Sequence, residues 1–441
     1  MRERAALLLL CLAQFVDVLG VTIAVVGLPE IGADLGGSGA ATQWVVSGYA
    51  LLFGGFLVPA GRLGDRFGHR RTFLAGVAAF AVASLTAGLA PALPVVVVAR
   101  AVQGMAAAFV VPSAFALVLT LTEEGPERVK AVAWWTATAA AGGAAGFACG
   151  GVLVQLLGWR AMFLVNVPVC LVVLAFAPGR LSGHGHGGRR APLDLPGAFL
   201  VTGGLLAGIT ALSGVAPAVT APAAVVLLAA FAVVEARSAN PLVPGRLAGS
   251  PRFLSALAVA FALTFATTPA SVVGTAFFQA GQGLSPGVTG VLFAPFSLGV
   301  VAGSAVGARV LDRTGARVSA TAGLGVVVVA LAAATPAVST SSTVLFAVSL
   351  AVSGCGLGAA SVAATHAGTE VVADGDRGIA SGLLNTAPQL GSAIGTAVIG
   401  AVALGPSPPH LATGLVVAAS VALAGVLAAT GLRAGVSSAV R

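Results

Sequence analysis

The sequence predicts an all-α protein that crosses a lipid bilayer many times, and three observations lead to this fold class. Of the 441 residues, 58% are hydrophobic and 8% are charged, whereas soluble domains carry about 25% charged residues. The apolar residues form continuous runs of about 18 residues or more, the length of a membrane-spanning helix, without the alternation that marks the strands of a transmembrane barrel. Glycine is abundant, with 60 residues, and small residues permit close helix packing in lipid.

The order of the apolar runs predicts fourteen transmembrane helices. The first run continues to Leu28 without a small-residue cleavage site, which favours a retained span over a signal peptide. The pair at 197–214 and 218–235 is the least regular, since each member is short and contains or adjoins glycine or proline. The helices are expected at residues 5–29, 44–61, 72–90, 94–119, 131–156, 161–178, 197–214, 218–235, 253–278, 287–308, 318–335, 342–366, 378–403 and 411–432.

The 22 Lys and Arg residues predict the orientation of the chain. When the N-terminus is placed in the cytoplasm and the sides alternate, 20 of the 22 fall in cytoplasmic segments, Arg160 falls outside and Arg100 falls within a span. This bias follows the positive-inside rule and predicts that both termini are cytoplasmic. The basic residues form no continuous stripe, so nucleic-acid binding is not expected despite the net charge of +8.

A faint internal repeat predicts how the helices are grouped. The loop "GRLGDRFGHRR" (61–71) follows the second predicted helix, and "ARVLDRTGARV" (308–318) follows the tenth. An offset of eight helices fits two six-helix bundles with two helices inserted between them, and parallel repeats of this kind occur in transporters. We therefore expect a first bundle at 1–180, two linker helices within 181–250 and a second bundle at 251–441.

The repeated loop combines glycines with charged residues. We expect Gly61 and Gly64 to let the second helix approach a neighbour closely and Gly68 to form a tight turn. Asp65 is suited to face a helix N-terminus, where a carboxylate is stabilised, and the arginines, Arg66 and Arg70 among them, are expected to pair with the other bundle in one conformation. Alternatively, the arginines simply follow the positive-inside rule. In the second copy the matching residues are Asp312, Arg313 and Gly315.

Residues 61–71 closely resemble the loop signature of the major facilitator superfamily, Gly-x-Leu-Ala-Asp-Arg-x-Gly-Arg-Lys. Three more stretches resemble signatures of that family. "RAVQGMAAAFVVPSA" (100–114) is similar to the helix-4 signature of proton-driven members, and "GGAAGFACGG" (142–151) is similar to the antiporter signature in helix 5. "GWRAMFLVNVPV" (158–169) is similar to the segment that follows it in the fourteen-helix drug:proton antiporters. The resemblance extends over essentially the whole chain and implies the major-facilitator fold.

The resemblance also implies roles for particular residues. Arg100 and Gln103 belong to the proton relay, and Gly142, Gly146, Gly150 and Gly151 form the antiporter motif. The alternative for these glycines is close packing without a gating role. The chain departs from the family in two places. Phe147 stands where the antiporter signature has proline, and Gly20 stands where helix 1 has its carboxylate, while Asp17 lies one turn earlier on a similar face.

Asp17 and Arg100 are the two ionisable residues that lie well inside predicted spans. Either side chain facing lipid would cost at least about 2.5 kcal/mol, so both are expected to face the protein interior or a water-filled cavity. Because burial disfavours the charged form of a carboxylate, we expect Asp17 to bind and release a proton. The alternatives are a static ion pair between the two helices and a contact with substrate alone. Neutral polar residues in or near spans either line a substrate cavity or form interhelical hydrogen bonds; they are Gln43, Gln155, Asn166, Asn385 and Gln389.

Together these features predict a proton-driven exporter of small amphipathic organic compounds, such as drugs and antibiotics, in a bacterial cytoplasmic membrane. The expected partners are the substrate, protons and lipid, and a monomer is expected. The chain lacks the phosphate-binding Gly-x-x-x-x-Gly-Lys-Ser/Thr motif, so ATP is not expected to supply the energy. We expect no enzymatic activity, cofactor or metal. The alternatives are an exporter of one metabolite made by the same cell, an uptake symporter, and a membrane receptor that does not transport.

Overall fold

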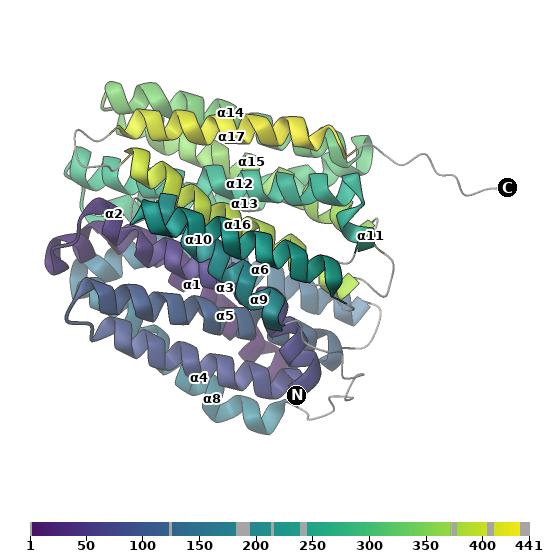
Figure 1. Cartoon of the computed structure of the whole chain (residues 1–441). Helices are drawn as coiled ribbons and strands as arrows, with labels where there is room; N and C mark the ends of the chain where they lie inside the picture. The colour runs from purple at the N-terminus through teal and green to yellow at the C-terminus, as the bar shows by residue number, and fades with distance from the viewer. Residues whose placement is uncertain are drawn as a thin grey trace.

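The computed structural model describes residues 2–122, 126–181, 195–212, 216–238, 245–370, 372, 377–403 and 410–432. All regular secondary structure in these residues is helical (Figure 1). A short π-helical segment, η1 (Phe277–Gly281), extends one of the helices. The α-helices are α1 (Arg2–Leu35), α2 (Gly39–Thr42), α3 (Trp44–Phe67), α4 (His69–Gly88), α5 (Leu93–Leu121), α6 (Pro126–Leu157), α7 (Trp159–Leu164), α8 (Asn166–Arg180), α9 (Leu195–Leu212), α10 (Pro217–Arg237), α11 (Gly245–Ala248), α12 (Pro251–Ala276), α13 (Pro286–Thr314), α14 (Ala316–Ser339), α15 (Thr343–Glu370), α16 (Arg377–Ala403) and α17 (Leu411–Ala429).

Each apolar run identified in the sequence coincides with one of these helices or with two consecutive helices. The run predicted at 161–178 is divided between α7 and α8, and the run at 253–278 is α12 continued by η1. By length and apolar composition, eleven helical segments in the described part of the chain are able to span a membrane. Three further apolar stretches, within α3, α6 and α9, are shorter.

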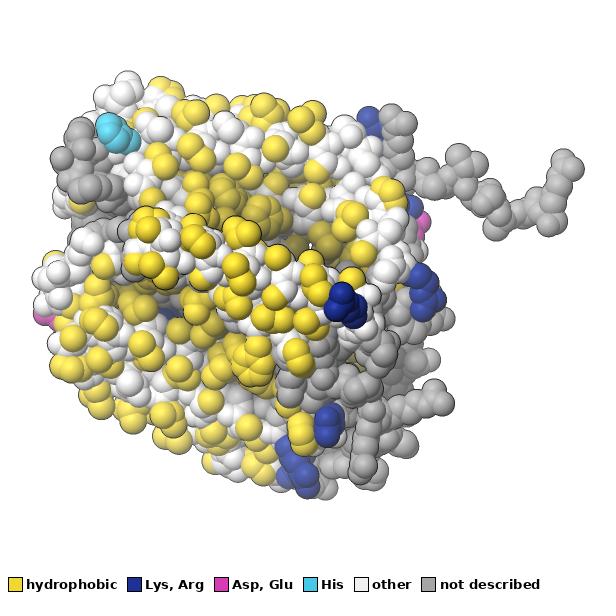
Figure 2. Space-filling view, in the orientation of Figure 1, with side chains coloured by type: hydrophobic (Ala, Val, Ile, Leu, Met, Phe, Trp, Pro, Cys, Tyr) yellow, Lys and Arg dark blue, Asp and Glu magenta, His cyan; other side chains and the backbone are white. Residues whose placement is uncertain are grey.

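The outer surface of the molecule is apolar over most of the face shown in Figure 2, and Lys and Arg side chains gather toward one end of it. Large hydrophobic side chains project from several helices, such as Leu156, which is 73% exposed, and Val219, which is 70% exposed. Contiguous apolar surface of this kind is unfavourable in water. It is the surface expected of helices that contact lipid.

The helix packing repeats between the first and second parts of the chain. In the first part, α1 packs on α5, α6 and α8, α5 packs on α3 and α4, and α4 packs on α8. In the second part, α12 packs on α15, α16 and α17, α15 packs on α13 and α14, and α14 packs on α17. The two patterns are identical when α1, α3, α4, α5, α6 and α8 are matched with α12 to α17 in order. The internal repeat seen in the loop sequences therefore extends to the arrangement of six helices.

The two copies of the loop sequence form the same backbone turn. α3 ends at Gly68, which has a φ of 92° and donates its N–H to the oxygen of Gly64 at 2.8 Å. α13 ends at Gly315, which has a φ of 85° and donates its N–H to the oxygen of Leu311 at 2.9 Å. Glycine adopts this backbone region without the steric cost that a Cβ would add. A single glycine at each position therefore lets one helix end and the next begin.

The two halves meet along two matching seams. α6 of the first half packs on α13 of the second, and α3 packs on α16. The repeat exchanges α3 with α13 and α6 with α16, so the two seams are equivalent to each other. The α9–α10 pair lies beside the α3–α16 seam, because α9 contacts both helices and α10 packs on α9 (Figure 1). A small apolar cluster of Ala50, Leu51, Ile209, Ala393 and Ala397 joins α3, α9 and α16.

Candidate functional site

Asp17, Tyr49 and Arg100 form a buried group in the first half of the chain. Asp17 lies near the middle of the 34-residue helix α1 and is 7% exposed. Tyr49 of α3 donates a hydrogen bond from its hydroxyl to Oδ1 of Asp17. The guanidinium carbon of Arg100, on α5, lies 4.3 Å from the centroid of the Tyr49 ring, a cation–π distance. Three helices thus converge on one phenol.

Arg100 is tied mainly to backbone oxygens. Its Nε donates to the oxygen of Val45 at 2.8 Å, and its Nη1 donates to Gln103 Oε1 at 3.3 Å and to the oxygen of Gly20 at 3.4 Å. Its Nη2 is buried and has no hydrogen-bond partner. The described hydrogen bonds and ion pairs include none between Arg100 and Asp17. Asp17 and Arg100 therefore lie in one buried group, in which Tyr49 contacts both side chains.

Gln103 extends the polar chain to α4. It is fully buried, accepts from Arg100 and donates from Nε2 to the hydroxyl of Ser84 at 2.7 Å. Ser84 in turn donates to the oxygen of Phe80 at 2.7 Å. Because buried polar groups are costly without partners, this continuous sequence of hydrogen bonds explains how the apolar bundle holds them.

Tyr49 is the residue of this group that we did not single out from the sequence. It is the only tyrosine in the chain and lies within the apolar run at 44–61. A buried phenol normally requires a hydrogen-bond partner, and this requirement is the signal that points to Tyr49. The partner comes from another helix, so its identity is visible only in the fold.

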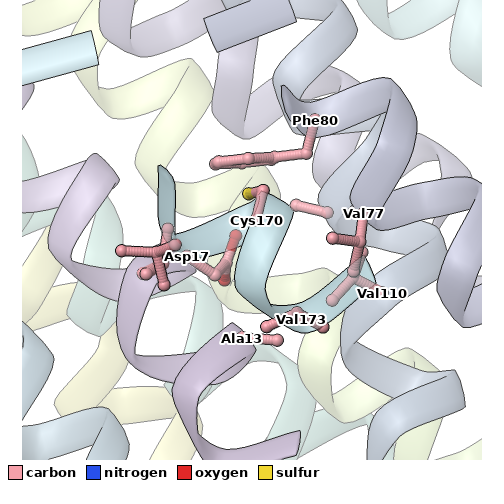
Figure 3. Close-up of a pocket in the computed structure, with 10 residues that line it drawn as sticks. Ala13, Asp17, Val77, Phe80, Val110, Cys170 and Val173 are labelled. Carbon is pink, nitrogen blue, oxygen red and sulfur yellow. The ribbon is translucent and has the colours of Figure 1, made fainter. Parts of the chain in front are cut away.

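A small apolar cavity lies beside Asp17, inside the first half of the chain. Its walls come from α1, α4, α5 and α8, and Asp17 is the one charged residue among those that line it. The cavity volume of about 20 Å³ is close to that of one water molecule. Figure 3 shows Phe80, Val77, Val110, Cys170, Val173 and Ala13 arranged around the space that the carboxylate faces. Asp17 therefore contacts a polar neighbour, Tyr49, and also lines an apolar cavity.

The glycines of the predicted antiporter motif bring α6 into close contact with two helices. A Cβ on Gly142 would stand 2.7 Å from the backbone oxygen of Phe15, and one on Gly146 or Gly150 would meet Thr22 or Ile23 of α1 at 1.8 and 2.4 Å. A Cβ on Gly151 would stand 2.2 Å from the oxygen of Pro286, at the start of α13. Three of the glycines therefore fit α6 to α1, and the fourth fits it to the second half.

Phe147 of α6 contacts the second half of the chain with its side chain. Its ring stacks on Phe293 of α13 with centroids 4.9 Å apart, and it meets Phe296 edge to face at 6.2 Å. About two turns further along α6, the side chain of Gln155 accepts a hydrogen bond from the N–H of Gly287 at 3.1 Å. The residue that replaces the expected proline of the signature is therefore a contact residue of the α6–α13 seam.

The loop motif between α3 and α4 agrees only in part with its predicted geometry. Gly64 is closely packed, since a Cβ there would stand 2.5 Å from His69 Nδ1. The expectation for Gly61 was wrong, because nothing lies within 4 Å of a Cβ at that position. Arg70 donates to the oxygen of Pro178 at 2.8 Å, on α8 of the same half, and Arg66 lies over the adjacent Phe67 ring at 5.5 Å.

The side chain of Asp65 lies outside the described residues. In the second copy of the motif, Asp312 and Arg313 fall in the last turn of α13, and Gly315 follows it.

The five neutral polar residues fall in different places. Gln43 lies against α16, where a Cβ on Gly400 would stand 1.7 Å from its Oε1. Gln389 lies against Gly54 of α3, and Gln155 lies in the α6–α13 seam. Asn385 is an exposed residue of α16.

Asn166 is instead buried within the first half, 3.8 Å from the Cβ position of Gly20, with an Oδ1 that has no hydrogen-bond partner. Three of the five residues therefore lie between the halves.

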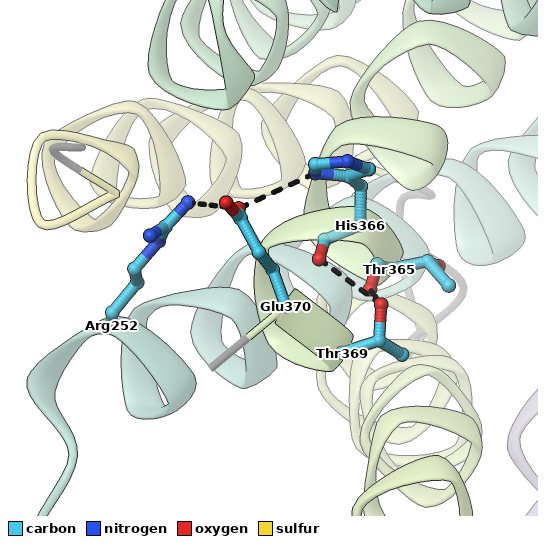
Figure 4. A network of polar contacts seen from close by, with 5 residues as sticks. All are labelled: Arg252, Thr365, His366, Thr369 and Glu370. Atoms are coloured by element: carbon cyan, nitrogen blue, oxygen red, sulfur yellow. Dashed lines mark hydrogen bonds and ion pairs between the residues drawn. The ribbon is translucent and has the colours of Figure 1, made fainter. Parts of the chain in front are cut away.

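Two ionic clusters at the helix ends were not predicted. Asp34, at the end of α1, accepts from Arg160 Nη1 at 2.7 Å and from Trp159 Nε1 at 3.0 Å. In the second half, Glu370 of α15 accepts from Arg252 of α12 and lies 3.7 Å from His366 Nδ1 (Figure 4). The pairs Arg160–Asp34 and Arg252–Glu370 join segments that are far apart in sequence, whereas His366 and Glu370 lie one turn apart on α15.

Residues 10–396 match the family model described as Major Facilitator Superfamily. The chain is 36% identical to the puromycin resistance protein of Streptomyces alboniger, over 92% of this chain and 83% of that protein. It is 40% identical to the cephamycin export protein of Amycolatopsis lactamdurans, over 89% and 84%. It is 35% identical to the lincomycin resistance protein of Streptomyces lincolnensis, over 92% and 85%.

Among solved structures, the fold is similar to that of a bacterial homologue of the human lysosomal transporter Spinster, in an inward-facing and unoccupied conformation. The TM-score is 0.67 with 16% identity, over 98% of this chain and 96% of that one. It is equally similar to the nucleoside transporter NupG, with a TM-score of 0.67, 13% identity, and coverage of 97% and 100%. At these identities the likeness concerns the fold alone.

Proposed function

The chain belongs to the Major Facilitator Superfamily, and we propose that it exports small amphipathic organic compounds, including antibiotics, in exchange for protons. Support for drug export comes from the relatives, which are named for resistance to puromycin and lincomycin, for export of cephamycin, and for resistance to and export of tetracenomycin C. These compounds differ widely in structure. We therefore propose a substrate class defined by amphipathic character rather than by one chemical group.

We propose that the protein lies in a bacterial cytoplasmic membrane with fourteen spans and both termini in the cytoplasm. Eleven spans correspond to the long apolar helices, and α3, α6 and α9 supply the other three. An even number of spans places both termini on one side, in agreement with the distribution of Lys and Arg. The proposed division is a first bundle at 1–180, linker helices within 181–250 and a second bundle at 251–441.

Transport would proceed by alternating access between the two bundles. The contacts between bundles gather where α6 and α16 end and α3 and α13 begin, through Gln155 with Gly287 and Gln43 with Gly400. At the same end, Gln279 of η1 donates to the oxygen of Val26 at 3.0 Å. This end is extracellular in the proposed topology, so we assign the conformation to a state that is closed to the outside. The candidates for substrate contacts are Gln43, Gln155 and Gln389, which lie between the bundles, and Asn385, an exposed residue of α16.

Proton coupling is assigned to Asp17, Arg100 and Gln103. The observation that carries this assignment is the burial of Asp17 in the middle of α1 between a hydrogen-bond donor and an apolar cavity. A carboxylate there is costly when it is charged and without a donor, so its protonation state depends on the contacts around it. Movement of the helices during transport would change those contacts and bind or release the proton. No ATP, metal or cofactor takes part in this mechanism, and the protein is proposed to act as a monomer.

The loop glycines and charges would act in the movement of the bundles. We propose that Gly64, Asp65, Arg66, Gly68 and Arg70 set the position of α4 relative to α3 at the cytoplasmic end. Asp312, Arg313 and Gly315 would serve α13 and α14 in the same way. The contact of Arg70 with Pro178 anchors this loop to α8.

A dedicated exporter of one compound is the second candidate function. A relative that is 40% identical is named for the export of cephamycin alone. This alternative uses the same fold and the same coupling residues, and it differs in the breadth of the substrate cavity. The two functions are separated by testing many chemically diverse compounds rather than one.

The experiment expresses the protein in a drug-sensitive bacterial host and measures susceptibility to a panel that includes puromycin, lincomycin and ethidium. Efflux of each protected compound is then followed with and without an uncoupler of the proton gradient. We expect resistance to several compounds and an efflux rate that falls when the uncoupler is added. Efflux that is indifferent to the proton gradient would contradict proton coupling, and protection against one compound only would favour the dedicated exporter.

A further inference from the structure

Tyr49 occupies a position that the coupling residues alone do not explain. Its hydroxyl donates to Asp17, its ring lies on Arg100, and it is 2% exposed. Because a hydrogen bond to an ionised carboxylate stabilises the charged form, this contact favours Asp17 without its proton. Among the described side chains, Tyr49 is thus the one that donates a hydrogen bond to the carboxylate of Asp17.

The opposite side of Asp17 suits the other protonation state. The cavity there is lined by apolar side chains such as Val77, Phe80 and Val110, with Cys170 beside them. A neutral carboxylic acid enters an apolar space at much lower cost than a carboxylate. The cavity is also large enough for a small movement of the carboxyl group, since it has room for about one water molecule.

From these contacts we propose that Tyr49 is a positioning residue for Asp17. Its hydroxyl holds the ionised carboxylate, and the cavity accepts the carboxyl group when it is protonated. Tyr49 keeps its own proton throughout, and the transported proton resides on Asp17. This proposal rests on the proposed proton coupling. It specifies how the protonation of Asp17 on α1 changes the contact that Asp17 makes with α3.

Tyr49 lies on α3 beside residues that contact the second half. The next two residues, Ala50 and Leu51, pack with Ala393 and Ala397 of α16 in one apolar cluster. On its other side the Tyr49 backbone is pressed against α5, since a Cβ on Gly104 would stand 2.1 Å from its oxygen. A change in the contact between Tyr49 and Asp17 would therefore act on α3, which packs directly on α16 in the seam between the halves.

Few ionisable groups surround Asp17 in the described part of the chain. α3 contributes Tyr49, α5 contributes Arg100 and α8 contributes Cys170. α4 faces it with Val77 and Phe80. α6 faces α1 with Gly142, Gly146 and Gly150. A pH-dependent change at Tyr49 would therefore report the titration of Asp17.

The chain offers a direct test, because Tyr49 is its only tyrosine. Replacing tyrosine by 3-fluorotyrosine during expression places one fluorine label in the full-length protein, without a mutation. We expect the fluorine resonance to move with pH in the purified protein and to become independent of pH in the D17N variant. A resonance that does not move with pH, or that moves equally in the D17N variant, would overturn the proposal.

A second measurement follows Asp17 itself by the infrared band of its carboxylic acid, identified as the band that is lost in D17N. In Tyr49→Phe the ring and its contact with Arg100 remain, and only the hydroxyl is removed. We expect the midpoint of the band's titration to move to higher pH by about one unit or more, since the charged form loses a donor. Equal midpoints in the wild-type protein and Y49F would overturn the proposal.

The matched control is Thr267→Val, which removes a buried hydroxyl of α12 that bonds to its own helix. It should leave the midpoint unchanged, and an equal shift in T267V would also count against the proposal. Both spectroscopic readouts are independent of transport. If the wild-type protein shows no proton-driven efflux, the proposed function fails, while the titrations still decide the role of Tyr49.

Discussion

The Phe147 ring of α6 stacks on the Phe293 ring of α13, with centroids 4.9 Å apart and an interplanar angle of 23°. This contact joins the two halves at the position where the antiporter signature has proline. Phe293 continues the contact into the second half, since it meets Phe278 of η1 edge to face at 5.7 Å. An aromatic path therefore runs from the first half into the packed interior of the second.

Substituting Phe147 by Ala should favour opening of this seam. Aromatic pairs contribute about 0.5–1.5 kcal/mol beyond their buried area, so the open population should rise by up to about tenfold. The reporter is Val26→Cys, since Val26 is fully buried where η1 contacts α1, in a protein whose native cysteines are replaced by serine. F147A should accelerate labelling of V26C by a membrane-impermeant thiol reagent. The control is Phe199→Ala on α9, whose side chain is 66% exposed, and an equal rate in both variants would argue against the contact.

Gly151 should tolerate no larger residue without loss of transport. A Cβ at this position would stand 2.2 Å from the oxygen of Pro286 and 3.1 Å from the Cα of Gly290, distances that require the two halves to separate. Gly151→Ala should therefore reduce efflux at least tenfold at equal expression. Gly325→Ala on α14 has nothing within 4 Å of its Cβ and should leave efflux unchanged. Normal efflux in G151A would mean that the seam is looser than the structure indicates.

The turn glycines predict matched losses of stability in the two halves. Gly68 and Gly315 have φ values of 92° and 85°, a region where a residue with a Cβ costs of order 1–3 kcal/mol. Gly68→Ala and Gly315→Ala should each lower the melting temperature in detergent by several degrees and by similar amounts. Gly61→Ala is the comparison, because that glycine is helical and nothing lies near its Cβ. A loss in G61A as large as in G68A would show that turn conformation is not the cause.

Much of the fold was predictable from the sequence, because continuous apolar runs in a chain with few charges determine where helices form. The repeated turns at Gly68 and Gly315 were also visible in the sequence, since a turn that requires positive φ leaves a glycine there. The division of the 161–178 run into α7 and α8 was not foreseen, and neither was the ionic contact between Asp34 and Arg160. That contact depends on two helix ends that meet only after the bundle forms.

The candidate site was predictable where one residue alone carries the signal. Asp17 and Arg100 stand out because ionisable groups are costly in an apolar span. Tyr49 did not stand out, since an aromatic residue in a span is common and its partner lies on another helix. Asn166 was grouped with residues that line the cavity, but it is buried within the first half. Helices that are apolar on all faces do not indicate which face meets the other bundle.

The most direct test of the mechanism uses the D17N variant in vesicles. Uphill accumulation of a substrate driven by a pH difference is compared with exchange of the same substrate at equal concentrations on both sides, which needs no proton. We predict that D17N loses the uphill accumulation and retains the exchange, since the amide occupies the position of Asp17 but binds no proton. Uphill accumulation by D17N at the rate of the unmodified protein would contradict the assignment of Asp17 as the proton carrier.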